Sequence, residues 1–180
     1  MNDKVIVLDN FRIQKNRSHL KNVTSINRKS LYILIGIPGS GKSYYAQKHL
    51  KNDSTIIVST DEIRREVYGS YKFSGDTNKE VIKIAKQKIE DGLICNLNIV
   101  FDATNTNKSY RKQIVSIGKK YETQMIAIVF QTSVSECINR NSLRSPERRV
   151  PNNIISSMAK FNSKIDKLNE GFDSVIYINS

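Results

Sequence analysis

The chain has 180 residues, of which 38% are hydrophobic and 26% charged, a composition that is ordinary for a globular protein. No apolar stretch approaches the length of a membrane span, and Asp3, Asp9 and Arg12 interrupt the place where a secretory signal needs an apolar core. Cys95 and Cys137 lack a Cys-x-x-Cys spacing, so we expect a cytoplasmic protein with reduced, core thiols. The net charge of +12 favours polyanionic partners, nucleic acid first, although a solvated basic surface or tail would give the same excess.

The first 30 residues differ from the rest. After Val5–Leu8, which could form a short strand, they are polar, rich in asparagine and basic, without sustained periodicity. We interpret residues 1–30 as an appended basic arm that could be partly disordered, and residues 31–180 as the folded domain.

From Leu31 onward, strand-like and helix-like patterns alternate. The predicted strands are Leu31–Ile35, Ser54–Ser59, Asn98–Asp102, Gln124–Phe130 and Asp173–Ile178. The predicted helices are Tyr44–Leu50, Asp61–Tyr68, Lys79–Asp91 (ending at Gly92), Lys108–Tyr121, Ser133–Leu143 and Pro151–Leu168, with a loop over Lys72–Asn78. This alternation predicts an α/β fold with a central, mostly parallel sheet of about five strands and helices on both faces. Ligands of such sheets bind beyond the carboxyl ends of the strands, so functional residues should follow the strands directly.

The most informative motif follows the first strand. Residues 36–43 read Gly-Ile-Pro-Gly-Ser-Gly-Lys-Ser and match G-x-x-x-x-G-K-[ST], the pattern of a loop that holds nucleotide phosphates. Glycine lets the backbone amides approach a polyphosphate, Lys42 can reach the β- and γ-phosphates, and Ser43 can bind Mg²⁺. The flanking strand and helix favour an ATP·Mg²⁺ site over a chance glycine-rich turn. We assign ATP binding to Gly36, Pro38, Gly39, Ser40, Gly41, Lys42 and Ser43.

A possible acid–base group follows the second strand. Asp61 and Arg64 are three residues apart on a predicted helix and share a face. A carboxylate beside the phosphate loop can take the proton of an attacking hydroxyl, while the arginine can hold an acceptor phosphate or orient the acid. The simpler interpretation is structural, because Ser59 and Glu62 form a capping-box pattern and Asp61 is favourable in any first helical turn.

The third strand ends at Asp102, where a phosphate-loop protein is expected to place a carboxylate of the Mg²⁺ shell. Of the polar residues that follow, Thr104 and Asn105 could cap the next helix or contact substrate. For Asn107 we favour capping.

Four arginines and one acid lie between the fourth strand and the last helix, in the stretch Arg140–Pro151. Their planar guanidinium groups could form a lid that neutralises the transferring phosphoryl group, or the stretch could be a solvated basic loop. These arginines are Arg140, Arg144, Arg148 and Arg149.

Together these features resemble the P-loop 5′-hydroxyl polynucleotide kinase family, in particular the phage enzyme's kinase domain and the kinase module of bacterial RNA end-healing proteins. The likeness runs from about Leu31 to the C-terminus and is most particular at residues 100–105 and 148–151. It implies that Asp61 is the general base on the 5′-hydroxyl and that Arg64 holds the acceptor's phosphate. It also implies that Arg140 and Arg148 are lid arginines, with Arg144 near the nucleotide.

The leading hypothesis is an ATP-dependent kinase that phosphorylates 5′-hydroxyl ends of RNA or DNA, with a single-stranded 5′ end as its partner. One alternative is a small-molecule or zeta-toxin-like kinase on the same scaffold. Another is a nucleotide-binding switch without transfer activity, against which the presence of both Lys42 and Asp61 argues mildly.

Overall fold

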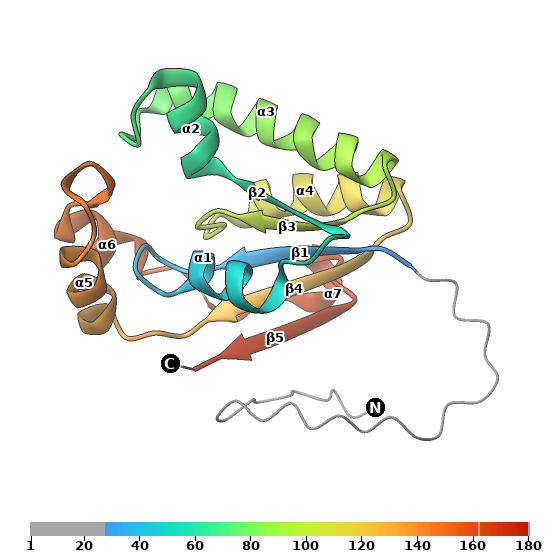
Figure 1. Ribbon diagram of the computed structural model, residues 1–180. Helices are drawn as coiled ribbons and strands as arrows, with labels where there is room; N and C mark the ends of the chain where they lie inside the picture. Colours follow the sequence, from blue (N-terminus) through green and yellow to red (C-terminus); the bar gives the residue numbers. More distant parts are fainter. Residues whose placement is uncertain (1–27, 162, 180) are drawn as a thin grey trace.

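A computed structural model describes residues 28–161 and 163–179. Its strands form one sheet in the order β2-β3-β1-β4-β5, and all neighbouring strands are parallel (Figure 1). Their bounds are β1 (Ser30–Ile35), β2 (Thr55–Ser59), β3 (Asn98–Asp102), β4 (Gln124–Phe130) and β5 (Ser174–Ile178). The predicted α/β fold and five-stranded sheet are therefore confirmed, whereas Val5–Leu8 and most of the predicted arm lie outside the described residues.

Helices cover both faces of this sheet, as predicted. On one face, α3 (Gly75–Ile94) and α4 (Lys108–Lys120) pack against the alternate residues Leu31, Ile33 and Ile35 of β1. On the other face, α1 (Lys42–Tyr45) and the π-helix η1 (Ala46–Leu50) pack against Leu34 and its neighbours. Because side chains alternate along a strand, those of β1 enter two separate apolar clusters, one on each face of the sheet. This fixes the register of β1 and therefore the position of its carboxyl end, where the phosphate loop begins.

Several of the remaining elements lie beyond the carboxyl edge of the sheet. Figure 1 shows α5 (Val134–Ser142) and α6 (Asn152–Met158) beyond the end to which the β1 arrow points. The other elements are α2 (Thr60–Tyr68), the short 3-10 helix η2 (Pro146–Arg148) and α7 (Lys167–Glu170). Within the described ranges, no helix is long and apolar enough to cross a membrane.

Two predicted boundaries of the long helix α3 were wrong. The helix begins at Gly75 and not at Lys79, because Ser74 caps it by accepting a hydrogen bond from the Thr77 amide. It also runs past Gly92 to Ile94, since Gly92 is a packing residue: an added Cβ would lie 2.5 Å from Cδ1 of Ile99. A glycine inside a helix can serve close approach to a strand as well as termination.

The predicted helix Pro151–Leu168 is in fact two short helices, α6 and α7, separated by an irregular segment. Its apolar residues join different clusters, because Ile155 packs with Ile37 of the phosphate loop whereas Ile165 joins the cluster on the sheet. Asp166 then caps α7 through the Asn169 amide, which favours a new helix start over continuation. The predicted helix Tyr44–Leu50 likewise divides into α1 and the π-turn η1.

The prediction that both thiols lie in the core was right for one of them. Cys137 is buried, whereas Cys95, at the C-terminal end of α3, is exposed, and both are free thiols. A cysteine in an apolar helical pattern suggests burial, but Cys95 lies just beyond the last helical residue, where the packed face of α3 has ended.

Candidate active site

The phosphate loop follows β1 and is shaped by two glycines with positive φ, +86° at Gly39 and +95° at Gly41. An added Cβ on Gly39 would lie only 2.2 Å from the carbonyl oxygen of Cys137, so the loop packs directly against the backbone of α5. No side chain caps α1 at its start, at Lys42, and the first amides of a helix have no intrahelical partner. These N–H groups are therefore left to an anion in the loop.

Lys42 and Asp102 form the buried centre of the site, and each is 7% exposed. The Nζ of Lys42 donates hydrogen bonds to the Ile37 carbonyl oxygen (2.8 Å) and to Oγ of Ser40 (3.2 Å). Burial lowers the pKa of Lys42 to about 8, although the nearby Asp102 charge raises it in part. Burial likewise raises the pKa of Asp102, opposed by the Lys42 charge and by a hydrogen bond with Ser43.

The hydroxyl of Ser43 and the carboxylate of Asp102 fit a Mg²⁺ ion, because both are hard oxygen ligands and they are in hydrogen-bond contact. Among residues 28–161 and 163–179, no group of three or more His, Cys, Asp or Glu side chains could hold a metal. An ion here would therefore take phosphate oxygens as further ligands, as Mg²⁺ does in nucleotide sites.

Asp61 and Arg64 lie together on α2, as their spacing predicts. Nη1 of Arg64 is 2.8 Å from Oδ1 of Asp61, and the Asp61 side chain is 54% exposed whereas that of Arg64 is 6% exposed. The N-cap residue of α2 is Ser59, whose hydroxyl accepts a 3.5 Å hydrogen bond from the Glu62 amide. The Asp61 charge also raises the pKa of Lys42, so the carboxylate acts electrostatically on the phosphate loop.

The basic stretch divides into two parts. Arg140 is fixed on α5, where its Nε lies 2.6 Å from Oε1 of Glu136 and its Nη1 lies 3.6 Å from the position of a Cβ on Gly41. The positive charge of Arg144 lowers the pKa of Lys42, so this arginine also acts electrostatically on the phosphate loop. These two arginines therefore belong to the phosphate side of the site.

Arg148 contacts α2 instead. Nη2 of Arg148 is 3.0 Å from Oε1 of Glu62 on α2, and its guanidinium carbon lies 4.6 Å from the centre of the Tyr71 ring. Nε of Arg149 donates to the Arg144 carbonyl oxygen at 2.8 Å. The stretch thus contacts α2 across the site, in the manner of a lid, through Arg148.

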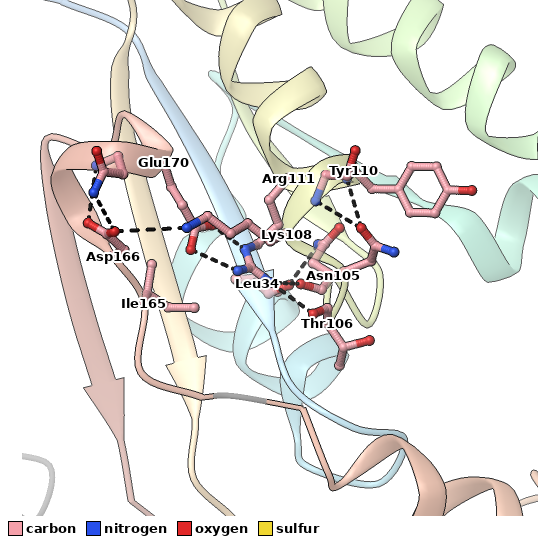
Figure 2. Close-up of polar contacts among 12 residues, drawn as sticks. Leu34, Asn105, Thr106, Lys108, Tyr110, Arg111, Ile165, Asp166 and Glu170 are labelled. Atoms are coloured by element: carbon pink, nitrogen blue, oxygen red, sulfur yellow. Dashed lines mark hydrogen bonds and ion pairs between the residues drawn. The ribbon is translucent and has the colours of Figure 1, made fainter.

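A buried network holds the loop that follows β3 (Figure 2). Arg111 on α4 is paired with both carboxylate oxygens of Glu170 on α7, at 2.6 and 2.9 Å, and donates to the carbonyl oxygens of Asn105 (2.8 Å) and Thr106 (3.0 Å). Asn105, at φ +49°, donates through Nδ2 to the Leu34 carbonyl oxygen at 2.7 Å. This network connects the ends of β1 and β3 and so positions the phosphate loop relative to Asp102.

Asn107 is the N-cap of α4, as predicted, and accepts hydrogen bonds from the amides of Ser109 and Tyr110. Sequence reasoning had left Asn105 open between capping and substrate contact, and its described contacts are structural. It missed Arg111 and Glu170 altogether. The available signal was Arg111 itself, because it precedes the buried Ile114 and Val115 by three and four positions on the same helix face.

It also missed two aromatic residues in the connection between α2 and α3. Tyr71 contacts Arg148 and Arg65, and the Phe73 ring lies 5.7 Å from the guanidinium carbon of Arg64. Large aromatic side chains in a predicted surface loop between basic residues were the signal that could have identified them.

Comparison with known proteins identifies the family of this fold and site. The model of the AAA domain family matches residues 31–162, and the chain belongs to this family. L-seryl-tRNA(Sec) kinase of Methanococcus maripaludis is 29% identical over 137 residues, which are 71% of this chain and 50% of the relative. The human 6-phosphofructo-2-kinase/fructose-2,6-bisphosphatase 3 is 31% identical over 115 residues, 52% of this chain and 21% of the relative.

Among solved structures, a chain of the Pnkp1/Rnl/Hen1 RNA repair complex has a TM-score of 0.64 at 25% identity, over 89% of this chain and 49% of that chain. The present chain thus spans half or less of the length of these relatives. The two curated relatives are kinases, and this supports a phosphotransferase with an ATP-binding P-loop. They act on different classes of acceptor by name, so the comparisons leave the acceptor to be argued from the site.

Proposed function

We propose that the protein transfers the γ-phosphoryl group of ATP to the 5′-hydroxyl end of a polynucleotide, RNA or DNA. The observation that carries this proposal is the Asp61–Arg64 pair, an exposed carboxylate held at 2.8 Å by a buried guanidinium group and near enough to Lys42 to affect its pKa. A carboxylate in this position can take the proton from the hydroxyl group of an acceptor that enters from solvent.

On the donor side, Lys42 would contact the β- and γ-phosphates and the loop amides would bind their oxygens. The Lys42 ammonium already lies inside the loop, on the Ile37 carbonyl oxygen and the Ser40 hydroxyl, and would exchange part of these contacts for phosphate. Ser43 and Asp102 would hold Mg²⁺, which neutralises phosphate charge when bound. Arg140 and Arg144 would face the same polyphosphate.

On the acceptor side, Asp61 takes the proton of the 5′-hydroxyl as its oxygen attacks the γ-phosphorus and the bond to the bridging β–γ oxygen breaks. The products are ADP and a 5′-phosphorylated end. Because the Arg64 side chain is only 6% exposed and contacts Asp61, its contacts favour orientation of the acid over direct binding of the acceptor's phosphate. Arg148 would approach the transferring group from the lid, where its planar fork suits phosphate oxygens.

Three further observations support a polynucleotide acceptor. The chain carries a net charge of +12, one relative is named for a tRNA substrate, and one structural neighbour is part of an RNA repair complex. A second candidate, phosphorylation of a small molecule, is favoured by the likeness to the 6-phosphofructo-2-kinase enzymes. The two candidates differ in whether the acceptor must be a strand.

The test measures transfer of the labelled γ-phosphate of ATP to a 5′-hydroxyl oligonucleotide, beside the same strand with a 5′-phosphate and beside sugars and free nucleosides. We expect label on the 5′-hydroxyl strand only. Asp61→Asn should lower the rate about 10²–10⁴-fold, because it keeps the size of the side chain but loses its proton affinity.

Glu66→Gln is a suitable control, since Glu66 is an exposed acid on the same helix whose carboxylate pairs with Lys88 at 2.7 Å. Nearly full activity in folded Asp61→Asn protein would assign Asp61 to helix stability alone. Label on a small molecule and on none of a range of RNA and DNA strands would give first place to the second candidate.

A further inference from the structure

The connection between α2 and α3, residues 69–74, presents two aromatic rings to guanidinium groups. Tyr71 lies 4.6 Å from the guanidinium carbon of Arg148 and 5.6 Å from that of Arg65, measured from the ring centre. Phe73 lies 5.7 Å from that of Arg64. Aromatic rings interleaved with arginines are the usual surface on which single-stranded nucleic acids place their bases.

The two rings are engaged to different degrees. Tyr71 is half-buried, and its hydroxyl accepts a 3.0 Å hydrogen bond from Arg65 and is 3.4 Å from a Glu62 oxygen. Its position is accounted for by contacts within the protein. Phe73 is 68% exposed and has no polar atom, so most of its ring surface remains in water.

The position of Phe73 relates it to the proposed chemistry. The Arg64 guanidinium group contacts the Phe73 ring and, through Nη1, the Asp61 carboxylate, so one side chain separates the ring from the proposed base. The contact with the cation accounts for where the ring lies, but it leaves the solvent side of the ring uncovered. A planar ligand stacked there would be separated from the Asp61 carboxylate by the ring and by the Arg64 side chain.

We propose that Phe73 is a stacking platform for the base of the acceptor's 5′-terminal nucleotide, which it holds so that the 5′-hydroxyl reaches Asp61. This inference rests on the proposed function and deepens it, because it makes Phe73 a positioning residue for a strand. Every base has a π face that can stack on the ring, whereas a sugar or amino sugar has none.

The experiment compares two single-stranded acceptors with identical phosphates and 5′-hydroxyl groups, one with an intact 5′-terminal nucleotide and one with an abasic residue there. For the wild-type protein we expect KM to be about 5- to 140-fold higher for the abasic strand, the range that loss of one base–aromatic stack produces. Phe73→Ala should raise KM for the intact strand to the abasic value, without changing KM for the abasic strand or for ATP. Phe73→Tyr and Phe73→Trp should retain the preference.

Ile94→Ala is the matched control. Ile94 is also an exposed apolar side chain, 66% accessible, but it lies at the opposite end of α3, about 28 Å from Gly75 at 1.5 Å per residue. Its replacement should leave both KM values unchanged.

The outcomes separate this inference from the function on which it rests. Equal changes of KM for both acceptors in Phe73→Ala would show that the ring only covers Arg64, and the stacking proposal would be wrong while the kinase remained. The same conclusion follows if the wild-type protein phosphorylates both strands equally well. Absence of transfer to either strand by the wild-type protein would overturn both proposals.

Discussion

The phosphate loop and the ends of β1 and β3 are held by buried hydrogen bonds, whereas the lid contacts α2 across the site through an exposed ion pair. Arg111 and Glu170 are 3% and 2% exposed, but Arg148 and Glu62 are 41% and 45% exposed. Removing one partner of a buried ion pair lowers the free energy of unfolding much more than removing one partner of an exposed pair. In the proposed kinase, this comparison predicts a rigid side that binds ATP and an opposite side that can rearrange around the acceptor.

The strongest test of the rigid side is Arg111→Ala, which leaves the Glu170 carboxylate buried without its partner. We expect a loss of about 3–5 kcal/mol in the free energy of unfolding, measured by urea denaturation. Lys108→Ala is the control, because its 3.8 Å pair with Asp166 is exposed on both sides and should contribute little. Equal losses of unfolding free energy in the two variants would contradict the difference between buried and exposed pairs.

An intermediate effect is expected from the buried ammonium group of Lys42. Its pKa is lowered to about 8, so the charge that faces the phosphates is present at pH 7 and lost as the pH rises through 8. The affinity for ATP, measured by calorimetry at constant Mg²⁺, should fall about tenfold between pH 7 and pH 9.

Lys42→Arg provides the control for this pH dependence, because a guanidinium group stays charged over the whole range. Its affinity can differ from that of the wild type but should not change between the two pH values. An affinity of the wild-type protein that is flat from pH 7 to pH 9 would show that the charge of Lys42 is not what binds the nucleotide.

The smallest effect belongs to the exposed ion pair of the lid. Arg148→Ala removes the ion pair with Glu62 and the contact with Tyr71, yet it should cost less than about 1 kcal/mol in the free energy of unfolding. Denaturation under the conditions used for Arg111→Ala checks this. A loss as large as that of Arg111→Ala would mean that the lid is part of the rigid structure.

The same contrast explains how far the sequence could predict the site. The phosphate loop was predictable because its geometry is local: eight consecutive residues specify the two positive φ angles and the place of Lys42. Asp102 was predictable because it ends an apolar strand. The fold followed from alternating patterns of the same local kind.

The contacts across the site were not predictable, because they join residues far apart in the chain. Arg148 and Glu62 are 86 positions apart, and Arg111 and Glu170 are 59 apart. Only the folded sheet brings these pairs together. For the same reason the capping-box pattern of Ser59 and Glu62 is only half realised, because the Glu62 carboxylate pairs with Arg148 of the lid and only the Glu62 amide serves the cap.

The contact between Gly39 and the backbone of α5 has an evolutionary consequence. Any side chain at position 39 would collide with the Cys137 carbonyl oxygen, so this glycine serves helix packing whether or not a nucleotide is bound. A descendant that had given up phosphoryl transfer would have to keep Gly39 to remain folded, while Lys42 and Asp61 would be free to drift. In homologues of this chain, those two positions, and not Gly39, should separate active enzymes from inactive ones.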